Sequence, residues 1–206
     1  MSVPRPTARE RRDQIIETAC ELFLEKGLAN VSTRDVTTRL NMGSGLLHHH
    51  FVNWQALRAE TVDAFVHSEI TDLEQRLSCL PADLLVETFV DWMAQDDEHK
   101  HWNLWLNAIV EGRQDAALEE VMKSAYARWH KCIAALLVRV SEARGLKNFQ
   151  SEAAAWRLSA LIDGLAGILV TRTRGLTLDE AKKLIIAQFE MELGYRQRKS
   201  EALPAS

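Results

Sequence analysis

The sequence has few of the residues that strands, tight turns and disulfide frameworks require. Its 206 residues include 9 glycines, 4 prolines and 3 cysteines, and no segment alternates polar and apolar residues as strands do. Cys20, Cys79 and Cys132 are far apart and form no Cys-x-x-Cys pair, which argues against a disulfide framework or a zinc finger. Their odd number favours reduced thiols in a cytoplasm.

Segments that would direct the chain into or across a membrane are also missing from the sequence. The basic residues between Arg5 and Arg12 lead into an amphipathic segment and not into the apolar core of a signal peptide. The longest apolar run, residues 161–170, is too short to span a bilayer and contains Asp163. We therefore expect a soluble, cytoplasmic protein with no membrane partner.

What the sequence does contain is helical periodicity, with apolar residues at three- and four-residue steps. This pattern predicts an all-α protein of about nine helices, over residues 8–26, 32–40, 44–50, 53–78, 82–95, 99–111, 115–144, 151–173 and 177–197. Capping boxes mark three of the starts: Thr7 with Glu10, Ser32 with Asp35, and Thr177 with Glu180. Gly27 and Gly145 are placed to end helices.

The net charge of −4 is unevenly distributed along the chain. Residues 1–57 hold seven Lys/Arg and six Asp/Glu, a balance of +1, whereas residues 58–206 hold 18 and 23, a balance of −5. A basic end on an acidic body suits a protein that presents one end to DNA.

Residues 32–51 have the pattern of a helix-turn-helix. Two short helical segments flank the turn Asn41-Met42-Gly43, whose residue types tolerate unusual backbone angles. The second segment starts with small residues, so its N-terminus can approach a duplex closely, and Leu47 and Phe51 can anchor its other face. This pattern predicts a DNA-reading helix over residues 44–50.

Residues 11–58 resemble the TetR family of transcriptional regulators. The resemblance rests on Ile-x-x-x-Ala-x-x-Leu-Phe-x-x-x-Gly from Ile15 to Gly27, on Thr33-Arg34-Asp35-Val36, and on the segments 40–51 and 53–57. It implies a DNA-binding domain over residues 1–53, a helical ligand-binding and dimerisation domain over 54–198, and a flexible tail over 199–206. It also implies a homodimer on palindromic operator DNA, most simply as a repressor.

The resemblance and the motif together predict the DNA-contacting residues. They are Arg9, Arg11 and Arg12 of the basic arm, with Thr33, Arg34, Gly43, Ser44, Gly45, Leu46, His48, His49, His50 and Trp54. His48 replaces the Tyr and Trp54 the Lys that are usual in the family. Consecutive helical residues point about 100° apart, so the three histidines are poorly placed to share a metal ion. We expect no metal and no cofactor; contact with nucleic acid is favoured, and solvated histidines are the alternative.

The segment from Ser159 to Leu165 resembles the C-terminal domain of the BetI-like branch of the family. Members of that branch respond to choline-type or other small metabolites, so the resemblance implies a small-molecule effector. It does not identify which effector this protein binds. From the residues themselves, aromatic pairs three apart lie on different predicted helices, and converging faces would line a cavity for a cationic or aromatic ligand. The predicted ligand-binding residues are Phe89, Trp92, Trp102, Trp105, Glu111, Tyr126, Trp129 and Asp163. The alternative is that these pairs are ordinary core.

The last two predicted helices carry the candidate dimer interface. Small residues on the first and a mixed seam on the second suit a four-helix interface between two subunits, as in the family. The predicted interface residues are Trp156, Ala160, Gly164, Gly167, Ile185 and Phe189. Packing of the same faces within one subunit is the alternative.

Two other classes of function compete with a ligand-responsive regulator. A helical enzyme is disfavoured because the sequence has no Ser/His/Asp context, phosphate-binding loop or metal-ligand spacing. A structural DNA-binding protein without a ligand switch remains open. The two classes differ in that a metabolite would abolish the DNA footprint of the regulator but not that of the structural protein.

Overall fold

The computed structural model describes residues 6–95 and 99–194, and within these residues every regular element is a helix. In chain order the elements are α1 (Ala8–Lys26), η1 (Leu28–Asn30), α2 (Thr33–Arg39), α3 (Ser44–His50), α4 (Trp54–Ser78), η2 (Ala82–Leu84), α5 (Leu85–Met93), α6 (Lys100–Gly112), α7 (Ala116–Ala143), α8 (Ser151–Thr171) and α9 (Leu178–Glu192). The all-α prediction is confirmed.

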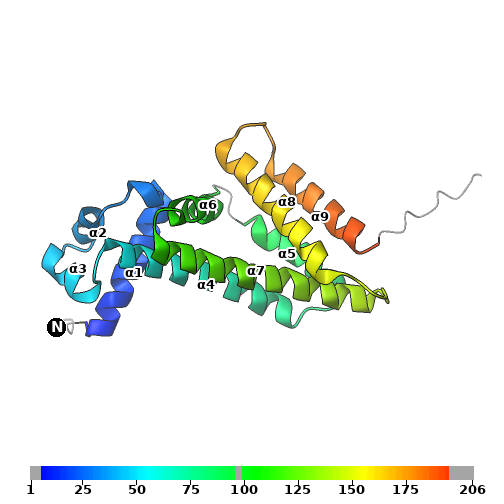
Figure 1. Ribbon diagram of the computed structural model, residues 1–206, viewed down its shortest axis with the longest axis horizontal. Helices are drawn as coiled ribbons and strands as arrows, with labels where there is room; N and C mark the ends of the chain where they lie inside the picture. The colour runs from blue at the N-terminus through cyan, green and yellow to red at the C-terminus, as the bar shows by residue number, and fades with distance from the viewer. Residues whose placement is uncertain (1–5, 96–98, 195–206) are drawn as a thin grey trace, which may run out of the picture.

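Helices α4 and α7 form the long axis of the molecule (Figure 1). They lie side by side, and α1, α2 and α3 gather at one end of the pair while α8 and α9 lie toward the other. Helix α6 packs against both α1 and α7, so it reaches from the N-terminal helices to the body. Because α4 runs from α3 into the body, it mechanically connects the two ends.

The predicted helix starts are confirmed by the capping geometry. Thr7, Ser32 and Thr177 each accept a hydrogen bond from the backbone N–H three residues later, and the acidic partner returns a contact. The Asn53 side chain caps α4 by accepting from the Ala56 N–H at 2.7 Å. In the turn between α2 and α3 the positive φ falls on Asn41, at 47°. Each start is therefore specified by local sequence.

Two predicted helices are shorter in the structure. The segment 82–95 divides into the 3-10 turn η2 and α5, which ends at Met93. The last helix ends at Glu192 and not at 197, because Gly194 takes a φ of 69° that ends the helical path. The predicted tail, residues 199–206, lies outside the described residues.

The buried apolar residues form two clusters that divide along α4. One cluster combines α1, α2 and α3 with the first half of α4 and with residues of α6 and α7, such as Leu104 and Met122. The other combines the second half of α4 with α5, α7, α8 and α9. The predicted domain limit at residues 53/54 therefore falls inside the first cluster, and the N-terminal helices are packed onto α6 and α7.

Helix α8 alone among the described helices is long and apolar enough to cross a membrane by length and composition. It is also a core helix, because Leu158, Ile162 and Leu165 are buried against the rest of the body. Its Arg157 pairs with Glu192 of α9 at 2.6 Å. These contacts favour a helix packed within the protein.

Candidate nucleic-acid interface and cavity

One face of helix α3 packs against the neighbouring helices, and the opposite face is exposed to solvent. Leu47 and Phe51 are buried, as the sequence predicts, and anchor α3 and its C-terminus in the first cluster. Leu46, His48 and His49 are exposed. Arg34 is exposed on the neighbouring α2 and Thr33 is half-buried at its start. The structure thus places most of the predicted DNA-contacting residues on one helix-turn-helix.

Side-chain packing among the described residues does not require glycine at Gly43, the N-cap of α3, or at Gly45. A Cβ added at either position meets no atom within 4 Å, and neither glycine has a positive φ. Glycine is favoured over alanine at an N-cap, the position of Gly43. Within the helix, as at Gly45, glycine costs stability relative to alanine, so another constraint is needed to explain its presence there. Close approach of an external surface to the N-terminus of α3 is such a constraint. Ser44 begins α3, and its side chain lies outside what the structure describes.

Two residues predicted to contact DNA also have partners within the chain. Arg12 pairs with Glu60 of α4, and its guanidinium lies 4.8 Å from the centre of the Phe51 ring. Trp54, at the start of α4, packs edge-on against Phe23 with ring centres 6.1 Å apart. Both side chains tie α4 to the N-terminal helices. Sequence alone did not reveal these intramolecular contacts, and the DNA contacts of both residues stay a prediction.

The rest of the basic arm continues into α1. Arg9 is exposed and Arg11 is half-buried within the first turns of the helix. Arg5 lies outside the described residues.

The three histidines lie at the end of α3, beside the first turns of α1. His49 and His50 make an edge-to-face contact with ring centres 5.5 Å apart. Partial burial lowers the pKa of His50, and the charges of His49, Arg12 and Arg11 lower it further. Within the described residues no group of three His, Cys, Asp or Glu could hold a metal ion. The histidines and arginines lie together at one corner of the molecule.

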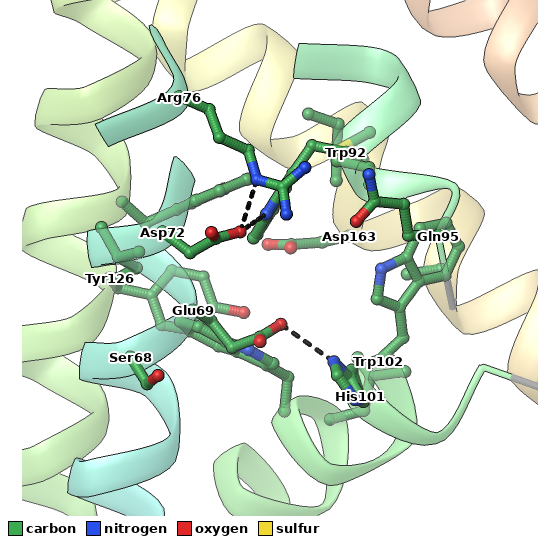
Figure 2. A pocket seen from close by; sticks show the side chains of 17 residues that line it. Ser68, Glu69, Asp72, Arg76, Trp92, Gln95, His101, Trp102, Tyr126 and Asp163 are labelled. Carbon is green, nitrogen blue, oxygen red and sulfur yellow. Dashed lines mark hydrogen bonds and ion pairs between the residues drawn. The ribbon is translucent and has the colours of Figure 1, made fainter. Parts of the chain in front are cut away.

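A cavity of about 560 Å³ lies in the body between α4, α5, α6, α7 and α8 (Figure 2). Six predicted ligand-binding residues line it together: Trp92, Trp102, Trp105, Tyr126, Trp129 and Asp163. The volume falls within the range of small-molecule sites, and such sites combine apolar walls with a few polar groups. Aromatic residues that are distant in sequence thus converge beside Asp163.

Asp163 lies beside Tyr126 in this cavity and has no ion-pair partner among the described residues. Burial raises the pKa of Asp163 to about 6, and hydrogen bonding to Tyr126 opposes that rise. Burial and the nearby Asp163 also raise the pKa of Tyr126. A partly buried carboxylate that lacks a cationic partner among the described residues is unfavourable, so the site is electrostatically suited to a positively charged ligand.

The rim of the cavity carries polar residues of α4 that the sequence analysis missed. Glu69 lies 3.0 Å from Nδ1 of His101 on α6, and Asp72 accepts hydrogen bonds from Trp92 and Arg76. Their spacing of three and four residues places them on one face of α4, which in sequence is typical of a solvated helix. Only the packing of α5 and α6 opposite α4 makes that face part of a cavity.

Two residues predicted to line the cavity lie elsewhere. Phe89 is fully buried in the core, where it stacks on Trp129 with ring centres 5.6 Å apart. Glu111 lies near the end of α6 and pairs with Arg58 of α4 at 2.8 Å. Phe89 and Trp92 are three residues apart on α5, but only Trp92 reaches the cavity.

The predicted dimer residues separate into two groups. Ile185 and Phe189 are 1% and 0% exposed, because they face the core within one subunit, so they are unavailable to a partner. Trp156 is 67% exposed, and Ala160 and Gly164 lie exposed on the same side of α8 with Gly167 partly exposed. On α9 the exposed large apolar residues are Leu184, Ile186 and Met191. The sequence placed Leu184 in the mixed seam of this helix but did not assign Ile186 or Met191 to the interface.

Two family models match the chain in the regions that carry these features. Residues 15–61 match the model described as bacterial regulatory proteins of the tetR family. Residues 81–194 match the model described as the C-terminal domain of BetI-type transcriptional repressors. The HTH-type transcriptional regulator PksA of Bacillus subtilis (strain 168) is 24% identical over 186 residues, which cover 88% of this chain and 89% of PksA.

Solved structures share the fold over nearly the whole chain. A transcriptional regulator from Saccharomonospora viridis in complex with choline is 25% identical with a TM-score of 0.79, covering 88% of this chain and 96% of that one. A transcriptional regulator from Pseudomonas aeruginosa PAO1 is 22% identical with a TM-score of 0.76, covering 92% and 94%. The N-terminal helices and the helical body are thus similar to known regulators as one unit.

Proposed function

Because the chain belongs to the TetR family of DNA-binding transcriptional regulators, with a C-terminal domain of the BetI type, we propose that it is a dimeric repressor released from operator DNA by a small cationic effector. The convergence of four tryptophans and Tyr126 around the unpaired Asp163 is the observation that carries this proposal. The protein acts in the cytoplasm, and the family is one of regulators and not of enzymes.

The effector is a compact cation such as a quaternary ammonium compound. Aromatic faces attract cations by about 0.5–2 kcal/mol each, and more when water is excluded. Trp92 and Trp129 form two adjoining walls, with ring centres 6.3 Å apart, and Asp163 supplies the compensating charge. The S. viridis regulator of similar fold binds choline, which supports this class for the present cavity.

The operator is read by α3 in the major groove. Gly45, His48 and His49 are exposed on α3, Gly43 is exposed just before it, and Arg34 is exposed on α2, as direct contact with a duplex requires. Arg9 and Arg11 at the start of α1 are placed to contact phosphates beside this surface. The helix is short and its anchoring residues are buried, so the outward residues can vary without loss of the fold.

Two copies assemble through α8 and α9. The exposed strip of Trp156, Ala160 and Gly164 allows close approach of helices, and Leu184 with Met191 adds apolar area. Gly164 and Gly167 have no atom within 4 Å of an added Cβ, so neither is needed for packing in one subunit. A dimer presents two α3 helices to half-sites roughly 34–36 Å apart.

Helix α4 transmits the signal because it belongs to both ends of the molecule. Five cavity-lining residues lie on its second half, and its first half packs in the cluster that holds α3. An effector shifts the balance between DNA-binding and released arrangements only by binding one more tightly. Cavity shape and the position of α3 are coupled through this helix.

The experiment is selection of operator DNA from a random pool, followed by release of the bound complex with choline. Isothermal titration should give a complex with choline and none with 3,3-dimethylbutan-1-ol, its neutral isostere. The variant Asp163→Asn should lose choline binding, while Asp83→Asn on the exposed turn η2 should keep it. A footprint that no quaternary ammonium compound alters would favour a DNA-binding protein without this switch.

A further inference from the structure

Asp72 makes an unusual double contact at the cavity rim (Figure 2). Its Oδ2 accepts a hydrogen bond from the indole N–H of Trp92 at 2.7 Å and another from Nε of Arg76 at 2.8 Å. Trp92 lies on α5, whereas Asp72 and Arg76 lie one turn apart on α4. One carboxylate oxygen therefore joins a wall of the cavity to the helix that leads to the DNA-binding end.

This contact engages the Trp92 indole outside the buried side of α5. The buried side of α5 is formed by Leu85, Phe89, Val90 and Met93, and Trp92 lies off that side, half-buried. An indole N–H in such a place needs a hydrogen-bond acceptor, and a carboxylate is a strong one. The bond holds the ring beside Trp129, tilted by 36°, where both rings border the cavity.

Asp72 differs from Asp163 in the charge available to a ligand. The guanidinium of Arg76 neutralises Asp72, and the pair forms an i,i+4 ion pair on α4. Asp163 has no cationic partner among the residues that the structure describes. The two carboxylates therefore have different tasks: Asp163 is the counter-ion, and Asp72 supports a wall.

We propose that Asp72 is a positioning residue of the effector site, which fixes the Trp92 ring against the ligand and makes α4 respond to the position of that ring. This inference rests on the proposed function, since it assigns a role within the same cavity. A ligand that stacks on Trp92 acts through Asp72 directly on α4. The link is separate from the contact between Glu69 and His101, which joins α4 to α6.

The first test observes Trp92 without any ligand. In protein labelled with ¹⁵N-tryptophan, Trp92→Phe identifies the Trp92 indole N–H signal among the six tryptophans. That signal should exchange slowly in the wild type and in Asp72→Asn, whose amide oxygen still accepts a hydrogen bond, and rapidly in Asp72→Leu. Fast exchange in the wild type would overturn the inference whether or not the protein binds a cation.

The second test is a double-mutant cycle on choline affinity. Asp72→Leu and Trp92→Phe should each weaken binding about five- to tenfold, corresponding to loss of one hydrogen bond of about 1 kcal/mol, and the double variant should be no weaker than either. Asp72→Asn should stay within about twofold of the wild type. Additive losses, or an Asn variant as weak as the Leu variant, would show instead that Asp72 acts by its charge.

The third test measures the coupling between the two sites. Asp72→Leu at saturating choline should release operator DNA less completely than the wild type at its own saturation, because the link to α4 is gone. Equal release would overturn the coupling part of the inference. Failure of the wild type to bind choline while its Trp92 N–H is protected would contradict the proposed function and leave the positioning role intact.

Discussion

The Arg58 guanidinium lies 3.7 Å from the Asp115 carboxylate, and the two side chains are 12% and 8% exposed. Arg58 belongs to the first turns of α4 and Asp115 caps α7 through the Leu118 N–H. Nε of Arg58 and Oδ2 of Asp115 have no hydrogen-bond partner within the described part of the chain. A polar contact with unused donors and acceptors thus lies where the DNA-binding end meets the body.

Removing one member of this pair should destabilise the fold strongly. Asp115→Ala leaves the Arg58 charge without its buried partner and removes the α7 cap, which together should cost about 2–4 kcal/mol of unfolding free energy. Urea denaturation measures this. Glu111→Gln is the control, because Glu111 also pairs with Arg58 but is 35% exposed, and it should cost less than about 1 kcal/mol. Equal losses of unfolding free energy in the two variants would mean that burial does not determine how much each ion pair with Arg58 contributes to stability.

The glycine at the second position of α3 should be required for DNA and dispensable for the fold. Gly45→Ala places a methyl group in open space, so the free energy of unfolding should stay equal or rise by about 0.5 kcal/mol. Operator affinity should fall at least about tenfold, since the methyl group meets the duplex. Ser124→Ala on the exposed side of α7 should change neither value. Unchanged operator affinity in Gly45→Ala would contradict the prediction that the N-terminus of α3 contacts the duplex.

Asp163 should make both stability and effector affinity depend on pH. Its pKa is raised to about 6, so the folded protein is favoured while Asp163 keeps its proton, and that advantage is lost as pH rises from about 4 through 6. Without ligand, Asp163→Asn should therefore be more stable than the wild type at pH 7.5, by about 1–2 kcal/mol after allowance for partial solvation, and similar at pH 4. Thermal denaturation at both pH values tests this.

Effector binding should show the opposite trend in the same pH window. A permanent cation prefers the ionised Asp163, so choline affinity of the wild type should rise about tenfold between pH 5 and pH 7. Asp163→Asn should bind choline weakly at either pH. A wild-type affinity that is constant over this range would exclude Asp163 as the counter-ion.

The exposed strip on α8 should govern assembly. In Gly164→Leu the added Cβ meets no atom within 4 Å and the position is exposed, so one subunit should still fold, but the side chain should prevent close approach of a partner helix. Sedimentation equilibrium should show a shift from dimer to monomer, with loss of operator binding and little change in choline affinity. Ala64→Leu on the exposed side of α4 serves as the size-matched control and should remain dimeric.

The helix starts and the reading helix could be predicted because their signals are local. Thr7 with Glu10 and Thr177 with Glu180 lie three residues apart, and Leu47 with Phe51 lie four apart, so one helix turn contains all the information. The positive φ at Asn41 likewise follows from the residue type in the turn. None of these features depends on how distant helices pack.

Features that depend on packing between distant helices could not be predicted in the same way. Periodicity marks Ile185 and Phe189 as apolar but does not say whether a neighbouring helix or a partner subunit covers them. Glu69 and Asp72 have the spacing of a solvated face until α5 and α6 are placed opposite them. Arg12 belongs to a run of arginines that is typical of a DNA-binding arm, and its ion pair with Glu60, 48 residues away, is visible only in the folded chain.

The histidines of α3 should make operator affinity fall as pH rises. His50 has a lowered pKa because burial and the charges of His49, Arg12 and Arg11 disfavour its protonated form, so DNA phosphate must offset that cost when it binds the imidazolium. Raising pH from 6 to 8 should weaken binding by roughly three- to tenfold at constant salt. His50→Gln should reduce this pH dependence. Arg34→Ala should weaken operator binding at every pH and leave the pH dependence unchanged. An operator affinity that is constant between pH 6 and 8 would show that the histidines of this corner do not bind phosphate as cations, and that the arginines supply its positive charge alone.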